Sequence, residues 1–359
     1  YRKFIVRVPV PIVPNIIERL FLLRMNKGPG LFLDIFGAGA FQAVRVALKL
    51  GVFESLSGGP LTAAGIAREI NANERGTRIL LEGLESFGYL KKLGDQYSNS
   101  SLTVKWLLAS SSTNLADIID LGENHILEFS RMYLEESIRR GKPPMTIYEW
   151  FDQKPGSWRV FQLYSAAVAR MVGDELLTKL KIPKDARRLI DVGGGHGLYS
   201  IMFCRQNPLL SASVFDLPQA LTMTDELISV EKMNGRVSLK PGNFWIDDLG
   251  DNYDVALMFN ILHAYSPEKN IELLRKVSRS MNSRGLIVVM EQLADKTVSQ
   301  LAKVGTRFFG LAYLAALGGQ TRTFDEISEW LLKSGFSNPR RINFRRTPGN
   351  SLVLATKAN

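Results

Sequence analysis

Four glycines lie close together in the segment Asp191-Val-Gly-Gly-Gly-His-Gly197. They follow an apolar run at 189–192 that is typical of a buried strand, and helical spacing resumes at 198–205. Because glycine has no Cβ, its backbone can take φ > 0 and lie directly against a ligand. The segment therefore predicts a strand, a ligand-binding turn and the start of a helix.

Two carboxylates accompany this turn. Asp191 ends the first strand, where it can hold an ammonium group, and Asp216 ends the next strand, where it can accept hydrogen bonds from both hydroxyls of a ribose. The dinucleotide fingerprint requires a further glycine three residues after Gly195, and Leu198 stands there instead. The pattern indicates a ligand that contains a nucleoside and disfavours NAD.

After Pro183 short apolar runs alternate with helical segments. The runs lie at 189–192, 213–215, 237–239, 253–258 and 286–290, and a closing hairpin is predicted at 341–344 and 352–356. Two helices in this half have capping signals, Ser266 before Pro267 and the capping box of Thr323 with Glu326. This alternation predicts an α/β fold with a doubly wound parallel sheet, which binds ligands at the carboxyl ends of its strands.

The first third of the chain has a different pattern. It predicts helices at 41–50, 63–70 and 74–87, and then a two-stranded wing at 90–107. A winged helix can bind DNA, and the net charge of +10 agrees with that. However, the third helix offers only Arg75 and Arg78 as base readers, beside Glu82 and Glu85. We therefore expect a structural or dimerisation role and no nucleic-acid partner.

Residues 1–33 combine three prolines with a short apolar stretch that contains internal charges. They do not fit a signal peptide, and we expect an arm that packs on a partner subunit or on its own domain. Peripheral membrane contact is the alternative. Cys204 is the only cysteine, which favours a buried role for it and a cytoplasmic location for the protein. The three histidines have no metal-ligand spacing, so no metal is expected.

Long helical stretches at 115–140 and 158–181 have broad apolar faces, which belong either to the core or to the wall of a ligand cavity. The 359 residues are enough for about two domains of ordinary size. We expect an N-terminal arm and winged-helix domain at 1–110, a helical connector with pocket helices at 111–182, and a ligand-binding α/β domain at 183–359.

From about residue 41 to its end the chain resembles the dimeric S-adenosylmethionine-dependent small-molecule O-methyltransferases, which include the plant caffeic-acid and the acetylserotonin enzymes. The motifs that carry the resemblance are 191–197, Phe215-Asp-Leu-Pro218, Gly242-Asn-Phe244, Ile261-Leu-His263, and Gly318-Gly319 followed by Arg322-Thr323. The resemblance implies S-adenosylmethionine as the cofactor. It also implies a Rossmann-like class I methyltransferase domain with a seven-stranded sheet, behind a winged-helix domain that forms a homodimer.

The resemblance also implies roles for individual residues. His263 would be the general base. Glu291, which matches the family's remaining acid, would either orient His263 or pack as a carboxylate at a strand end. The residues expected at the cofactor are Asp191, Gly193, Gly195, Asp216, Leu217, Asn243 and Phe244. Those expected around the acceptor are Phe161, Ser165, Met171, Phe309, Tyr313 and Ala316.

Three positions depart from the family pattern, and all of them lie at the expected site. Ala264 follows His263 where the family has Asp, Thr321 replaces a second acid, and Asn243 replaces an Asp that contacts adenine. The segment 308–316 is apolar, which suits a lipophilic acceptor such as a polyketide, quinone, carotenoid or tetrapyrrole. O-methylation of such a hydroxyl is our first hypothesis. The alternatives are C-methylation of a large lipophilic acceptor or chemistry without methyl transfer, and a DNA-binding regulator that senses S-adenosylmethionine.

Overall fold

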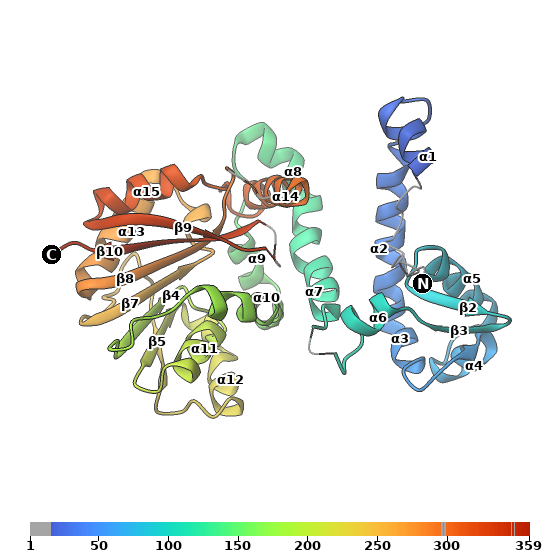
Figure 1. The fold of residues 1–359 in the computed structure, drawn as a ribbon, viewed down its shortest axis with the longest axis horizontal. Helices are drawn as coiled ribbons and strands as arrows, with labels where there is room; N and C mark the ends of the chain where they lie inside the picture. Colours follow the sequence, from blue (N-terminus) through green and yellow to red (C-terminus); the bar gives the residue numbers. More distant parts are fainter. Residues whose placement is uncertain (1–15, 112, 296, 298, 346, 348) are drawn as a thin grey trace, which may run out of the picture. The chain divides into compact units, whose positions relative to one another are not determined.

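The computed structural model describes residues 16–111, 113–295, 297, 299–345, 347 and 349–359 (Figure 1). The chain divides into two compact units between residues 120 and 121. In the described part of the chain, no helix is both long enough and apolar enough to cross a membrane.

The first unit consists of helices around a small sheet. Its helices are α1 (Ile16–Arg19), the π-helical η1 (Leu20–Arg24), α2 (Phe32–Leu50), α3 (Val52–Ser55), α4 (Ala63–Glu69), α5 (Glu74–Ser86) and α6 (Ser101–Trp106). Its strands, in the antiparallel order β1-β3-β2, are β1 (Leu61–Thr62), β2 (Leu90–Leu93) and β3 (Gln96–Asn99). Phe53, Ile66, Leu81 and Leu84 are among the buried side chains of its core.

Two predicted boundaries in this unit are wrong. Helix α2 begins at Phe32 and not at residue 41, because the helix continues through Gly37 and Gly39. The wing ends at Asn99 and not at residue 107, because Ser100 caps a helix there. Its Oγ accepts a hydrogen bond from the backbone N–H of Thr103 at 3.3 Å.

A helical region leads into the sheet of the second unit. It contains α7 (Ala116–Leu121), the π-helical η2 (Gly122–Leu127), α8 (Glu128–Arg140), α9 (Ile147–Gln153) and α10 (Ser157–Lys179). The long helices agree with the predicted stretches, and α8 ends where Gly141 takes a left-handed conformation at φ 74°. The sequence analysis did not predict α9, although Thr146 and Glu149 form a complete capping box at its start.

The second unit is organised around the predicted seven-stranded sheet, with the order β6-β5-β4-β7-β8-β10-β9. Its strands are β4 (Arg188–Val192), β5 (Ser211–Asp216), β6 (Val237–Pro241), β7 (Tyr253–Phe259), β8 (Met281–Gln292), β9 (Phe336–Asn343) and β10 (Asn350–Lys357). The first five strands are parallel, and β10 pairs antiparallel with both β8 and β9. The doubly wound sheet and its closing hairpin were therefore predicted correctly.

Helices cover both faces of this sheet (Figure 1). Helices α10, α11 (Leu198–Gln206) and α12 (Thr224–Val230) pack on one face, where Cys204 is buried as expected. Helices α13 (Pro267–Ser280) and α15 (Phe324–Lys333) pack on the other. The remaining helices of this unit are η3 (Pro218–Leu221), η4 (Leu262–Ala264) and α14 (Gln300–Leu317), the last of which contacts α8.

Candidate functional site

The residues predicted for cofactor and catalysis gather at the carboxyl ends of the parallel strands. The glycine turn follows β4, Asp216 ends β5, Asn243 follows β6, and His263 follows β7 beside Glu291 of β8. Strand β4 lies between β5 and β7, so the chain direction across the sheet reverses at β4. Open α/β sheets bind their ligands in the crevice at such a switch point.

The turn has the conformation that its glycines predicted. Gly193, Gly195 and Gly197 have φ values of 69°, 45° and 69°. A Cβ on Gly193 would clash with the side chain of Ile261, and a Cβ on Gly197 would lie 2.8 Å from Thr224 Cγ2. Only glycine therefore fits these two positions without rearrangement of their neighbours.

Asp216 is held by the turn and by its own strand end. Its Oδ2 accepts a hydrogen bond from the backbone N–H of Gly195 at 2.8 Å, and its Oδ1 accepts one from that of Leu217 at 2.7 Å. Each oxygen keeps a further lone pair that can accept a ribose hydroxyl. Burial raises the pKa of Asp216 to about 6, although these two hydrogen bonds act in the opposite direction.

Asp191 lies beneath the turn and not on its surface. It is buried and accepts a hydrogen bond from Ser200 Oγ at 2.9 Å. Burial raises its pKa to about 7, and the charge of Asp216 adds to that shift. His196 in the same turn accepts a hydrogen bond on Nδ1 from the backbone N–H of Leu198 at 3.0 Å, and burial lowers its pKa to about 3. His196 is therefore neutral at physiological pH.

Aromatic rings surround the expected adenine position. The rings of Phe244 and Trp245 both make edge contacts with Tyr265, at centroid distances of 6.0 and 4.9 Å. Asn243 Oδ1 accepts a hydrogen bond from the backbone N–H of Trp245 at 2.9 Å. The Asn243 carbonyl therefore also fixes the local turn, and its NH₂ group is the part that can donate to a ring nitrogen of a purine.

His263 and Glu291 form a buried pair. His263 Nδ1 lies 2.8 Å from Glu291 Oε2, and Glu291 Oε1 accepts a hydrogen bond from the backbone N–H of Leu262 at 2.7 Å. A carboxylate at Nδ1 favours the tautomer that has its proton on Nδ1 and a free lone pair on Nε2. Gly318 and Gly319 follow α14. Gly319 can pack directly against the loop that carries His263, because a Cβ on Gly319 would clash with the carbonyl oxygen of His263.

Tyr313 of α14 covers one face of the imidazole. The two rings are stacked, with centroids 3.7 Å apart and planes inclined by 8°. The Tyr313 hydroxyl donates a hydrogen bond to Gln292 Oε1. Phe309, in the preceding turn of α14, stacks on the Tyr313 ring with the two centroids 5.9 Å apart. Of the residues expected around the acceptor, Tyr313 thus contacts His263 and Phe309 contacts Tyr313.

The other four expected acceptor residues have different surroundings. Phe161 and Ala316 pack against a cluster of aromatic side chains built on Phe129 and Phe151. Ser165 is half-buried on α10, and Met171 on the same helix is 40% exposed. The structure therefore brings Tyr313 to the imidazole and Phe309 to Tyr313, whereas Met171 lies on an exposed part of α10.

Two residues of this site were missed by the sequence analysis. Tyr148 of α9 lies near Asp216 and Tyr265, and its pKa is raised by burial and by both of these groups. The Tyr148 ring also makes an edge contact with Phe161, one of the residues expected around the acceptor, at a centroid distance of 6.1 Å. The capping box of α9 was a usable signal. The second missed residue, Gln162 of α10, is buried against the glycine turn.

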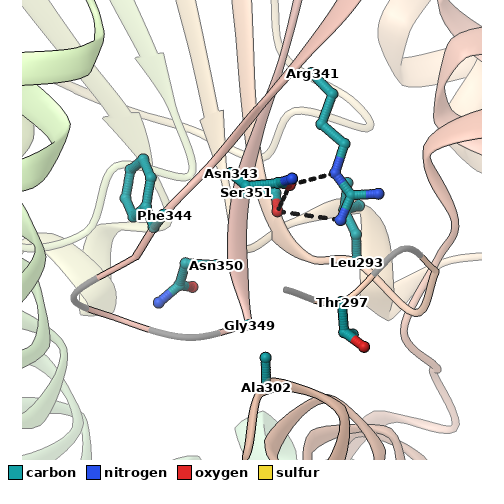
Figure 2. A pocket seen from close by; sticks show the side chains of 9 residues that line it. All are labelled: Leu293, Thr297, Ala302, Arg341, Asn343, Phe344, Gly349, Asn350 and Ser351. Atoms are coloured by element: carbon teal, nitrogen blue, oxygen red, sulfur yellow. Dashed lines mark hydrogen bonds between the residues drawn. The ribbon is translucent and has the colours of Figure 1, made fainter. Parts of the chain in front are cut away.

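A small cavity lies at the closing hairpin and is distinct from the crevice (Figure 2). Arg341, Asn343 and Ser351 on its wall are joined by hydrogen bonds. Its volume is about 10 Å³, which is about enough for one water molecule. The cavity is therefore too small to hold an organic ligand.

The chemistry of the crevice fits S-adenosylmethionine. Asp216 has lone pairs that can accept ribose hydroxyls, the ring of Phe244 with its aromatic neighbours could contact an adenine, and the glycine turn leaves bare backbone that a ligand can approach closely. Among the described residues, no group of three or more His, Cys, Asp or Glu side chains could hold a metal ion.

Comparison with known proteins agrees with this geometry. Residues 113–337 match the family model of the O-methyltransferase domain, and residues 34–110 match that of the O-methyltransferase dimerisation domain. The first match covers more than half of the chain and includes the entire cofactor crevice.

Similar proteins extend over nearly the whole chain. The 3-hydroxy-5-methyl-1-naphthoate 3-O-methyltransferase of Streptomyces sahachiroi is 25% identical, over 92% of this chain and 96% of its own length. The L-tyrosine C(3)-methyltransferase of Streptomyces lavendulae is also 25% identical, over 91% and 92%. The crystal structure of human N-acetylserotonin methyltransferase in complex with SAM (S-adenosylmethionine) aligns with a TM-score of 0.76, at 22% identity, over 92% of this chain and 99% of that one.

Proposed function

Because this chain belongs to the O-methyltransferase family, we propose that it methylates a hydroxyl group of a lipophilic aromatic small molecule. The chain is an S-adenosylmethionine-dependent methyltransferase, as predicted. Its dimerisation domain at residues 34–110 supports the predicted homodimer. The chemical nature of the acceptor and the roles of individual site residues are the parts that we propose.

The observation that carries the proposal is the buried His263–Glu291 pair. With Glu291 accepting a hydrogen bond from Nδ1–H at 2.8 Å, Nε2 is free to accept the proton of a hydroxyl group. A phenol ionises near pH 10, so its oxygen needs a base as it becomes a nucleophile. Glu291 then stabilises the imidazolium that forms, as the buried aspartate does in hydrolytic triads.

The reaction is a nucleophilic displacement in which the methyl group moves from sulfur to the acceptor oxygen. The bound cofactor supplies an electrophilic methyl group on a sulfonium. The acceptor oxygen forms the new C–O bond, the electron pair of the broken C–S bond stays on sulfur, and the hydroxyl proton moves to His263 Nε2. The stacked Tyr313 ring fixes the plane of the imidazole, so that Nε2 stays directed at the acceptor.

The aromatic wall supports a lipophilic acceptor. Tyr313 is stacked on His263, Phe309 contacts Tyr313, and Phe161 belongs to the cluster of aromatic side chains built on Phe129 and Phe151. Flat apolar walls with few polar groups suit aromatic ligands. The similarity to a naphthoate O-methyltransferase agrees with this class of acceptor.

C-methylation is the second candidate, and one comparison favours it. The relative from S. lavendulae is by its name a C(3)-methyltransferase of L-tyrosine, a phenol. The same base can serve there, because removal of the phenolic proton raises the electron density on the ring carbons. The site geometry is thus compatible with transfer to oxygen or to carbon of one phenolic acceptor.

Transfer of a radiolabelled methyl group to a panel of hydroxylated aromatics tests the proposal. We expect His263→Ala to lower kcat by about a hundredfold or more and to leave the Kd of S-adenosylhomocysteine unchanged. An unchanged rate in this variant would exclude His263 as the base. NMR of the product separates an O-methyl ether from a methylated ring carbon, and labelling of C alone would overturn the O-methylation proposal.

A further inference from the structure

We propose that Gln162 binds the α-ammonium group in the methionine part of S-adenosylmethionine, through its side-chain oxygen Oε1. The residue lies on α10, outside the strand ends that carry the predicted cofactor residues. The inference requires that S-adenosylmethionine is the cofactor. It does not depend on the identity of the acceptor or on the role of His263 as the base.

The first observation is an unsatisfied buried polar group. Gln162 is only 2% exposed, and its Oε1 has no hydrogen-bond partner among the described residues. A buried carbonyl without a donor costs free energy, so nearly all such groups in proteins have a partner. A donor that arrives with a ligand would supply the missing partner.

The second observation is where this oxygen lies. A Cβ built on Gly195 would be 2.7 Å from Gln162 Oε1 and 3.2 Å from its Nε2, so the amide lies directly over the glycine turn. Small residues on the same side of α10 place it there. Ala166 and Ala169 are buried against α11, and a Cβ on Gly173 would lie 2.8 Å from Met202. Helix α10 can therefore approach the turn closely.

The third observation concerns the other acceptors around the turn. The Gly195 carbonyl accepts a hydrogen bond from Thr224 Oγ1 at 2.7 Å, and the Gly194 carbonyl accepts one from the backbone N–H of Gly197 at 2.9 Å. Asp191 is buried and bonded to Ser200. An ammonium group has three donors and no acceptor, so it needs oxygens at short range. Gln162 Oε1 is the side-chain oxygen at the turn that still lacks a donor.

Isothermal titration with three ligands tests the proposal. These are S-adenosylmethionine, decarboxylated S-adenosylmethionine, which keeps the amine, and 5′-methylthioadenosine, which lacks the whole amino-acid group. Gln162→Met keeps the side-chain volume and removes the acceptor. We expect it to weaken both amine-containing ligands by about ten- to hundredfold, the usual loss for a hydrogen bond to a charged group, and to leave 5′-methylthioadenosine unchanged.

Each alternative outcome overturns the proposal in a recognisable way. Equal weakening of all three ligands would mean that Gln162 only shapes the turn. Weakening of S-adenosylmethionine alone would assign the side chain to the carboxylate. Unchanged affinity for all three would remove Gln162 from the site. Failure of the wild type to bind S-adenosylmethionine would contradict its assignment as the cofactor, and this outcome can be distinguished from a failure of the proposal for Gln162.

Thermal unfolding provides the control for folding. Because Oε1 has no partner in the ligand-free protein, Gln162→Met should leave its Tm unchanged or raise it, and only the stabilisation by S-adenosylmethionine should shrink. Leu163→Met, at the exposed neighbouring position, should change neither value. A lower Tm of ligand-free Gln162→Met would indicate a structural role and would contradict the proposal.

Discussion

Opposing effects act on Asp216. Burial disfavours its charged form, whereas the two backbone N–H groups that it accepts favour that form, and the result is a pKa of about 6. The group is thus ionised at physiological pH, with a smaller margin than an exposed aspartate has. Only the ionised carboxylate can accept both ribose hydroxyls, because a protonated one must donate its own hydrogen.

We therefore predict that cofactor affinity depends on pH through Asp216. The affinity for S-adenosylhomocysteine should be constant above pH 7 and should fall about tenfold per unit below pH 6, as the carboxylate takes up a proton. Asp216→Asn has the same shape but cannot ionise. It should bind weakly at every pH, with little change between pH 5 and 8, and calorimetric Kd values across that range measure both effects.

The asparagine variant is a matched control, because it retains all three histidines and Asp191. Wild-type affinity that stays constant down to pH 5 would contradict the prediction.

The stability of the ligand-free protein should change with pH in the opposite direction to the affinity. Burial raises the pKa of Asp216 above its value of about 4 in an unfolded chain, so the folded state binds this proton more tightly. The contribution of Asp216 to stability therefore falls as pH rises from about 4 to about 6.

At the scale of elements, α14 reaches the reacting groups through Tyr313. The Tyr313 ring is stacked on His263, and its hydroxyl is bonded to Gln292, which follows Glu291 in β8. Gln292 also donates to Asn350 Oδ1 at 2.6 Å, at the start of β10. This chain of contacts joins a helix and two strands around the imidazole.

We predict that the Tyr313 ring, and not its hydroxyl, positions His263. Tyr313→Phe keeps the stacked ring and should hold kcat within about threefold of wild type. Tyr313→Leu leaves the imidazole free to rotate and should lower kcat by roughly tenfold or more. Neither variant should change the Kd of S-adenosylhomocysteine, and separate measurement of kcat and KM for the acceptor shows which step is affected.

Equal losses in both variants would assign the effect to the hydroxyl and its bond with Gln292. Unchanged kcat in Tyr313→Leu would mean that the stacking has no role in the reaction. The neighbouring Phe308 is 52% exposed, and Phe308→Leu is the control for a general loss of aromatic area on α14.

The strands and the cofactor turn could be predicted because their signals are local. The apolar run at 189–192 and the glycines after it specify a strand and a turn wherever the rest of the chain lies. Strand β8 was only partly predicted, because it begins at Met281 and runs through Arg284 at φ 63° and Gly285. In sequence, such residues are typical of a turn. In the structure Met281 pairs with Tyr253 of β7 and Leu286 pairs with Val255 of the same strand, so the residues between them stay at the sheet.

The contributions of Gln162 and Tyr148 could not be predicted in the same way. In sequence Gln162 is one polar residue in an apolar helix, and its place over Gly195 depends on how closely α10 approaches α11. Helix α9 has seven residues and follows two prolines, so its periodicity is too short to separate from a loop. For α9 the capping box of Thr146 and Glu149 was the one local signal. The place of Gln162 depends on contacts between distant segments, which a single sequence does not display.

At the scale of the whole molecule, the dimerisation domain has large apolar side chains that are exposed on α2. Ile35 and Phe36 near the start of α2 are 55% and 54% exposed, and the Phe36 ring stacks on that of Phe32 at 5.7 Å. Both residues lie within the matched dimerisation domain. Clustered large apolar side chains on a surface are typical of protein interfaces, whereas isolated ones are ordinary.

We predict that this surface of α2 contributes to the homodimer. The double substitution Ile35→Glu with Phe36→Glu would bury two charges at the interface and should raise the dimer dissociation constant roughly a hundredfold or more. Sedimentation velocity at micromolar concentration should then show the 40.1 kDa chain as a monomer, whereas the wild type should sediment at twice that mass. Leu209→Glu is the control, because Leu209 is 57% exposed and lies between α11 and β5, far along the chain from the dimerisation domain. An intact dimer in the double variant would place the interface elsewhere on the domain, and dissociation in the control would mean that added charge alone separates the subunits.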